Sequence, residues 1–159
     1  MAFRMGLLAA GCLVLLLNPG SASAQGPVAV LPIQGLRFGT LTPGLVSPVS
    51  VLDNQGRAVI EVTGRGQVSV IFGLPTGLRT REGGFLPLHF GASDGRVLIA
   101  GNGKIHNFDP RSPYNFVLSG SQGQASVFLG GTASPTITQR PGTYEGEITV
   151  TVVISNGNT

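Results

Sequence analysis

Apolar and polar residues alternate along much of this chain, and the clearest alternation follows the Pro141-Gly142 pair near the C-terminus. Successive side chains of a β-strand point to opposite sides of a sheet, so a period of two predicts one buried and one wet face. Residues 139–155 are therefore expected to form a tight turn and one long strand. Its expected inward residues are Tyr144, Ile148, Val150, Val152 and Ile154, and its outward ones are Glu145, Glu147, Thr149, Thr151 and Ser155.

The same period of two recurs in shorter segments. The predicted strands are residues 36–39, 57–63, 67–72, 85–90, 96–100, 114–118, 125–129 and 132–138. Turn clusters such as Gly64-Arg65-Gly66 separate them, and no segment after residue 24 has the apolar spacing of a helix. About eight to ten short strands with regular turns predict an all-β protein, an antiparallel β-sandwich or barrel.

The first 24 residues have the layout of a secretory signal peptide. Arg4 supplies a positive start, residues 6–17 form an apolar run, and Ala22-Ser23-Ala24 has the small-x-small pattern of a cleavage site. The apolar run is shorter than the about 20 residues that a membrane-spanning helix needs. We therefore expect cleavage after Ala24 and no membrane span once the signal is removed.

An alternative interpretation of the leader centres on Cys12. Residues 9–12, AAGC, loosely resemble the lipid-attachment box of bacterial lipoproteins, in which the cysteine becomes the acylated first residue. That cleavage leaves almost no apolar segment before the cysteine, unlike the ordinary layout of a signal peptide. Cleavage after Ala24 instead leaves a chain without cysteine, so its core must hold the fold in an oxidising compartment without disulfides.

The rest of the chain has the length of one domain. Residues 25–35, QGPVAVLPIQG, form a short apolar arm that does not alternate cleanly, and they are expected to be an edge strand or a loose extension. Residues 36–159 are expected to form the β-sandwich domain, which is long enough to bury a real core.

Charged residues are few. The formal net charge is +3, and without Arg4 nine basic residues face seven acidic ones, which leaves +2. The longest basic cluster is Arg79-Thr80-Arg81, so no nucleic-acid partner is predicted. Low charge with many Gly, Ser and Thr residues is typical of an extracellular β protein, and we expect a periplasmic, cell-surface or secreted location.

Residue types that carry catalysis or bind metals are sparse. His89 and His106 lack the local spacing of a ligand pair, and no cysteine remains after residue 24 to complete a zinc site. Either histidine could meet Asp94 or Asp109 in space, but ordinary surface histidines are the simpler interpretation. We expect no catalytic residue, no metal site and no cofactor, so the protein is predicted not to be an enzyme.

Three further patterns have simpler structural explanations. Residues 101–104, GNGK, lack the first glycine, the following Ser or Thr and the helix of a phosphate-binding loop, and they predict a hairpin turn. Glu145 and Glu147 are expected to solvate a strand and protect its edge rather than to act as an acid–base pair. Tyr144 is either a core aromatic or part of an interface, and the core is favoured.

Three motifs resemble a known bacterial family. They are LRFGTL at residues 36–41, VFLGGT at 127–132, and QRPGTYEG at 139–146 followed by ITVTV. They resemble the secreted domain-of-unknown-function family 4402, which is similar in pattern to spore-coat-U-like and chaperone–usher pilin domains. The resemblance covers nearly all of the chain after residue 24, in order. It implies an immunoglobulin-like, pilin-like β-sandwich in a secreted structural protein, pilus-like or adhesive, and it implies no catalytic residue.

The chain also departs from that pattern. Chaperone–usher pilins often carry a disulfide near their first strands and a longer alternating N-terminal extension, and neither is present here. These departures bear on polymerisation rather than on the sandwich.

Two functional hypotheses follow. In the first, the protein is an assembly subunit, and the edge beside its last strand receives an extended segment from another copy or from a periplasmic chaperone. In the second, it is a self-contained sandwich that binds a ligand such as a glycan through its central loops, residues 79–112. The residues expected at a strand-pairing interface are Val28, Val30, Ile33, Tyr144, Ile148, Val150, Val152 and Ile154.

Overall fold

The structure is a computed structural model that describes residues 2–3 and 28–155. Its strands are β1 (Ala2–Phe3), β2 (Ala29–Gln34), β3 (Gly39–Thr40), β4 (Ser47–Val49), β5 (Ala58–Gly73), β6 (Gly77–Arg79), β7 (Phe85–His89), β8 (Gly95–Ile99), β9 (Lys104–Phe108), β10 (Tyr114–Leu129), β11 (Gly131–Ala133) and β12 (Thr149–Ser155). The described residues contain no helix, and all the strand pairs are antiparallel. The predicted all-β, antiparallel class is confirmed.

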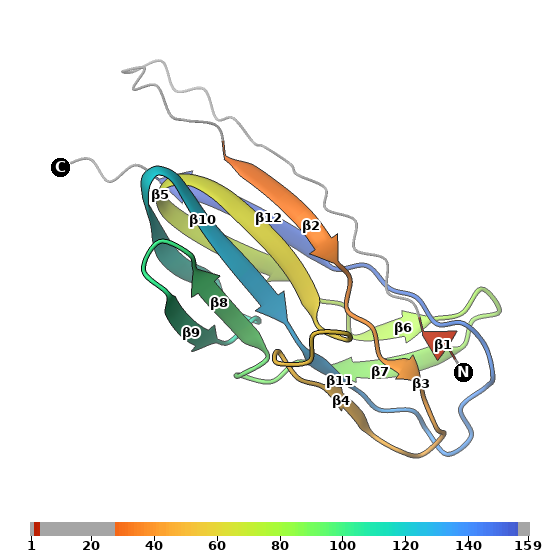
Figure 1. Cartoon of the computed structure of the whole chain (residues 1–159). Coiled ribbons are helices and arrows are strands. Elements are labelled where there is room, and N and C mark those ends of the chain that lie inside the picture. Colours follow the sequence, from red (N-terminus) through yellow and green to blue (C-terminus); the bar gives the residue numbers. More distant parts are fainter. Residues whose placement is uncertain (1, 4–27, 156–159) are drawn as a thin grey trace.

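The strands form three sheets (Figure 1). The largest has the order β12-β5-β10-β8-β9, with β2 also paired to β5, and the second has the order β4-β11-β7-β6. The third is the short pair of β1 and β3. One core cluster joins the two larger sheets, with Ile60 and Leu129 from the first and Val49 and Leu86 from the second. The architecture is therefore sandwich-like.

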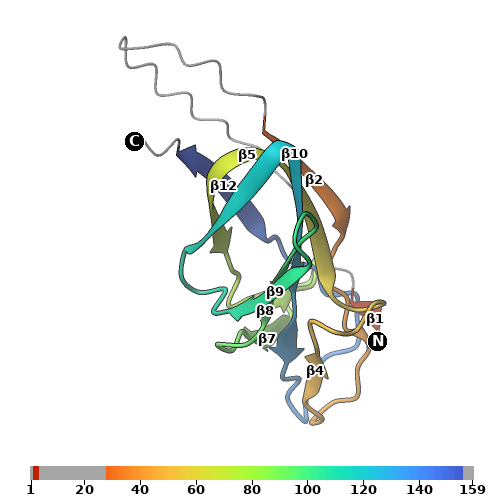
Figure 2. The ribbon, with the colours of Figure 1, turned by 60° about the vertical axis from the view of Figure 1, so that its left-hand side comes forward.

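Strands β5 and β10 are 16 residues long and pair along most of their length. The prediction of a strand break at Gly64-Arg65-Gly66 is wrong, as is the prediction of separate strands at residues 114–118 and 125–129. Gly64 and Gly66 have φ angles of +155° and +122°, which let the backbone bend while the strand continues. Figure 2 shows β5 and β10 bending together over one end of the molecule.

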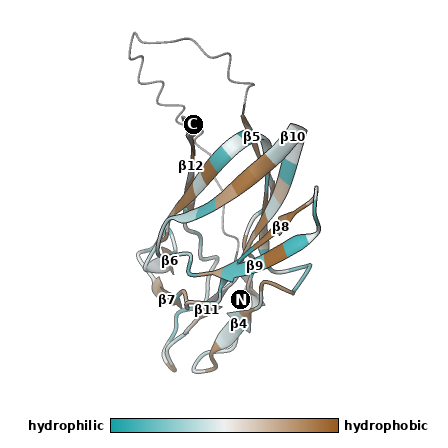
Figure 3. Cartoon of the chain, turned by 90° about the vertical axis from the view of Figure 1, so that its left-hand side faces the viewer, coloured by the Kyte–Doolittle hydropathy of each residue, from teal (hydrophilic) through white to brown (hydrophobic). Residues whose placement is uncertain are grey.

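The inward positions of this bent ribbon follow the predicted alternation. Figure 3 shows brown, hydrophobic segments that alternate with pale or teal segments along β5 and β10. The buried residues of β5 are Ala58, Ile60, Val62, Val68, Val70 and Phe72. The two halves of β5 therefore bury the same side of the strand in one continuous core.

Aromatic rings close the core beside β9. Phe108 of β9 stacks on Tyr114 of β10 with ring centroids 4.4 Å apart, and on Phe72 of β5 at 6.3 Å. Tyr114 in turn stacks on Phe116 at 6.2 Å. Such pairs contribute about 0.5–1.5 kcal/mol each beyond area burial, and here they join three strands.

The C-terminal stretch differs from its prediction in one respect. Strand β12 begins at Thr149, so residues 139–155 do not form one long strand. Glu145 instead makes an isolated antiparallel bridge to Arg79, with both N···O distances 2.9 Å, before the chain crosses to the largest sheet. The predicted faces are nonetheless confirmed, because Tyr144, Ile148 and Val150 are buried. Buried and exposed residues keep alternating where the chain crosses between the two sheets, although its hydrogen-bonding partner changes from Arg79 to β5.

Two other predicted strands are shorter than expected. Only Gly39–Thr40 is a strand in the first motif, although Leu36 and Phe38 are buried as predicted. The strand predicted for residues 132–138 ends at Ala133. The apolar run and the cleavage pattern of the predicted leader, together with Cys12, lie outside the described residues.

Candidate functional site

The N-terminal arm and the last strand share one edge of β5. Strand β12 pairs with residues 67–73 of β5, from Thr149 opposite Gly73 to Ser155 opposite Gln67. Strand β2 pairs with residues 59–63, from Ala29 opposite Thr63 to Gln34 opposite Val59. Both are antiparallel to β5, so β2 and β12 run in the same direction and lie end to end. The arm therefore pairs with β5 and not with the last strand itself, so the expected pairing of the arm with residues 144–154 is not what the structure shows.

One face of the arm packs against the core. Val30 lies opposite the fully buried Val62, and Val28 and Val30 are partly buried against the core cluster. Leu31 points the other way and is 55% exposed. Ile33 falls at an irregularity of the pairing between Pro32 and Gln34, and it is 51% exposed. Val28 and Val30 thus contact the core as a donated strand would, whereas Ile33 does not.

Val28 and Ile154 meet at the bend of β5. A Cβ atom at Gly64 would lie 3.0 Å from Val28 Cγ2 and 3.6 Å from Ile154 Cδ1. The arm and the last strand therefore converge on the one position of β5 where the absent side chain leaves room for both. Val28 of the arm and Ile154 of the last strand, both members of the predicted interface, thus approach the same residue of β5.

The other predicted interface residues follow the last strand away from the arm. Val150 lies opposite Phe72, and Val152 lies opposite Val70. Tyr144 and Ile148 precede β12 and are fully buried. Their burial agrees with the core interpretation of Tyr144, and the structure places Tyr144 and Ile148 outside the region where β2 pairs.

Gln34 fastens the end of the arm, which sequence reasoning missed. Its Nε2 donates to the main-chain carbonyls of Arg57, Asn54 and Gln55 at 2.7, 3.2 and 3.3 Å. All three acceptors belong to the turn that precedes β5. No sequence signal marks this contact, because main-chain carbonyls are present at every residue and only folding brings these three together.

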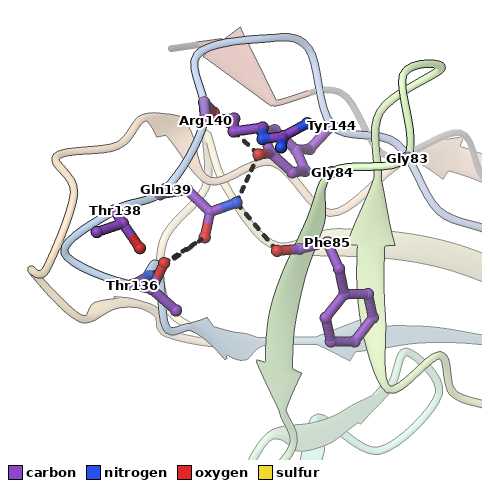
Figure 4. Close-up of a pocket in the computed structure, with 8 residues that line it drawn as sticks. All are labelled: Gly83, Gly84, Phe85, Thr136, Thr138, Gln139, Arg140 and Tyr144. Carbon is purple, nitrogen blue, oxygen red and sulfur yellow. Dashed lines mark hydrogen bonds between the residues drawn. The ribbon is translucent and has the colours of Figure 1, made fainter.

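A small polar hollow of about 270 Å³ lies between the loop before β7 and the loop after β11 (Figure 4). Gln139 lies at its floor, where Nε2 donates to Phe85 O at 3.0 Å and to the Tyr144 hydroxyl. The Tyr144 hydroxyl donates to Arg140 O at 2.9 Å, and Gln139 Oε1 accepts from Thr136 N at 3.2 Å. These internal bonds fasten the loop before β12 to β7, so the floor of the hollow is built as a structural joint.

The tyrosine bond has a known structural use. In immunoglobulin-like domains a "tyrosine corner" joins a tyrosine hydroxyl to the main chain a few residues upstream. Tyr144 bonds to the carbonyl of a residue four positions earlier. The bond closes the turn between Arg140 and Tyr144, ahead of β12.

The acid and base candidates do not converge. His89 lies on β7 and His106 on β9, in different sheets, and both are exposed. Glu145 and Glu147 are exposed as predicted. Within the described part of the chain, no group of three His, Cys, Asp or Glu residues is arranged to hold a metal ion.

The loop after β9 is part of the region that the second hypothesis assigns to ligand binding. Its charged side chains pair with each other. Arg111 Nε and Nη2 donate to the two carboxylate oxygens of Asp109 at 2.8 and 2.7 Å. The hydrogen bonds from the side chain and backbone N–H of Arg111 lower the pKa of Asp109 to about 2. Phe108 is buried in the aromatic stack. The main polar groups of this loop therefore bind each other.

The glycine-rich segment after β8 is a hairpin turn. Lys104 N donates to Asn102 Oδ1 at 2.9 Å, and β8 pairs with β9 on either side. The hairpin predicted for residues 101–104 is confirmed.

No family model and no curated protein sequence matches this chain. The resemblance to domain-of-unknown-function family 4402 therefore stays a prediction. Among the described residues, no helix is long and apolar enough to cross a membrane.

Proposed function

We propose that this protein is a non-enzymatic structural subunit of a bacterial cell-surface or periplasmic assembly. In this proposal the fold is an immunoglobulin-like, pilin-like β-sandwich, and copies associate when the N-terminal arm of one pairs with β5 of another. The observation that carries the proposal is the position of β2, end to end with β12 on one edge of β5. The leader-like first 24 residues support a secreted location.

The arm is built to be exchanged. It is joined to the fully buried Leu36 through Gly35, it pairs with a single strand, and its outward side chains such as Leu31 are exposed. When identical copies exchange a terminal strand, each acceptor regains the contacts that it loses. The exchange itself therefore costs little net free energy. Mass action then favours the exchanged state at high local concentration.

The acceptor edge cannot stay empty. Ile60 and Val62 are fully buried and lie opposite Pro32 and Val30 of the arm, to which the β5 main chain is paired. Removal of the arm uncovers this edge of β5 and leaves a row of unpaired N–H and C=O groups, which templates strand addition. A strand from a second copy or from a periplasmic chaperone satisfies the same groups.

Deletion of residues 25–35 tests this proposal. We expect the deleted chain to lose the self-association of the full chain and to bind a synthetic peptide of residues 25–35 in trans, measured by light scattering and calorimetry. The control is the same peptide with Val28→Asp and Val30→Asp, which should bind at least about tenfold more weakly because it buries two unpaired carboxylates. A full chain that is a stable monomer, unchanged by the deletion, contradicts the proposal.

A further inference from the structure

An exchanged arm needs a fixed register on its acceptor strand. A slip by two residues keeps every side chain of a strand on its own face, so the alternation of apolar residues does not exclude it. Val28 and Val30 are identical side chains two positions apart, so a slip by two residues puts one valine at the position that the other occupied. Apolar packing alone therefore discriminates weakly between the observed register and its neighbours.

Gln34 distinguishes the observed register of β2 on β5 from registers shifted by two residues. Its amide nitrogen faces three main-chain carbonyls, those of Asn54, Gln55 and Arg57, at 2.7–3.3 Å. Carbonyls only accept, so this contact requires a donor at the end of the side chain. A slip by two residues moves the side chain by about 6.6 Å along the strand and breaks all three hydrogen bonds.

The turn that carries these carbonyls is fastened independently of the arm. Arg57 N donates to Asp53 O at 3.0 Å, and Arg57 Nη1 donates to Val51 O at 2.8 Å. Gln55 N donates to Asp53 Oδ1 at 2.9 Å. The acceptor group is therefore formed by the body of the domain and does not depend on which arm occupies the edge.

We propose that Gln34 and the carbonyls of Asn54, Gln55 and Arg57 form a register stop, which holds a β2 strand at one position on β5. For the chain's own arm the stop acts within one molecule. For the arm of a second copy it rests on the proposed function, and there Gln34 is the residue that selects the register of assembly. Gln34 is a positioning residue, since it acts through the pairing of β2 with β5.

Cysteine pairs across β2 and β5 report the register directly. In a Cys12→Ser background, Leu31→Cys with Glu61→Cys tests the observed register, while Leu31→Cys with Val59→Cys or with Thr63→Cys tests slips by two residues. Directly opposed residues lie within disulfide reach, whereas diagonal neighbours are about 7–8 Å apart. In the otherwise unchanged chain we expect oxidation to favour the Glu61→Cys pair.

Substitutions of Gln34 test the stop. Gln34→Glu keeps the shape but aims a carboxylate at three carbonyls, and Gln34→Ala removes the donor without adding charge. In both, the ratio of observed-register to slipped disulfide should fall about two- to tenfold. Gln34→Lys keeps a donor of similar reach and should retain the ratio, while Gln124→Glu, an exposed change on β10, controls for added charge.

The outcomes separate this proposal from the proposed function. An unchanged ratio in Gln34→Glu and Gln34→Ala overturns the register stop, whatever the oligomeric state. Disulfides that form only within single chains, judged on non-reducing gels, contradict exchange and leave the register stop intact. A fall of the ratio in Gln34→Lys as large as that in Gln34→Glu also overturns the stop, because packing rather than hydrogen-bond donation then sets the register.

Discussion

At the scale of single residues, two glutamines organise the parts of the chain that leave the regular sheets. Gln139 joins the loop before β12 to β7, and Gln34 joins the arm to the turn before β5. Gln139 Nε2 bonds to a main-chain carbonyl 54 residues away, and Gln34 Nε2 bonds to three carbonyls 20 to 23 residues away. A sequence shows that a glutamine is present but not which carbonyls surround it, so neither role could be predicted.

Tyr144→Phe is expected to destabilise the protein by about 1–2 kcal/mol, because it removes the hydroxyl that joins Gln139 to Arg140 O. The measurement is urea unfolding followed by circular dichroism. Tyr114→Phe, in a ring that stacks on Phe108, is the matched control and should change the stability by less than about 0.5 kcal/mol. Equal losses in the two variants would show that the Tyr144 hydroxyl contributes no more to stability than the Tyr114 hydroxyl does.

At the scale of elements, β5 is the strand on which the others depend. It pairs with β10 on one edge and with both β12 and β2 on the other. The bend at Gly64, with a φ of +155°, allows one strand to serve both halves, and the absent side chain leaves room for Val28 of the arm. A glycine between two alternating segments reads locally as a turn, and only the pairing with β10 shows that the strand continues.

Gly64→Ala is expected to loosen the arm. The added Cβ would lie 3.0 Å from Val28 Cγ2, and the φ of +155° is strained for alanine, so we expect a loss of about 1–3 kcal/mol and faster amide exchange in β2. Gly120→Ala is the control, since Gly120 has a φ of +93° with no atom within 4 Å of the added group. It should lose stability without faster exchange in β2, and faster exchange in both variants would assign the effect to backbone strain alone.

At the scale of the whole molecule, the N-terminal arm and the last strand complete the same edge. The arm reaches β5 next to the end of β12, so the beginning and the end of the described domain converge on one strand (Figure 1). In the proposed function, association depends on whether the arm that pairs with residues 59–63 belongs to the same copy or to another one. Other contacts of the sandwich can stay unchanged in either state.

A disulfide lock of the arm tests this dependence. The chain with Cys12→Ser, Leu31→Cys and Glu61→Cys, oxidised as a dilute monomer, should be more stable by about 3–4 kcal/mol and should remain monomeric when concentrated. Reduction frees the arm and should restore association, followed by light scattering. The reduced and oxidised forms of one preparation control each other, and association that persists in the oxidised monomer would show that arm exchange is not its cause.

The sequence by itself determined the all-β class and the inward face of several strands and of the chain end, where Tyr144, Ile148 and Val150 are buried. This was possible because alternation is a local property of an extended backbone. Only the tertiary structure decided that Gly64 bends a strand, that the last strand begins at Thr149, and that the arm pairs beside it. These features depend on hydrogen-bond partners 20 or more residues away. The contact of Gln34 with three distant carbonyls belongs to the same class, and the register of the arm depends on it.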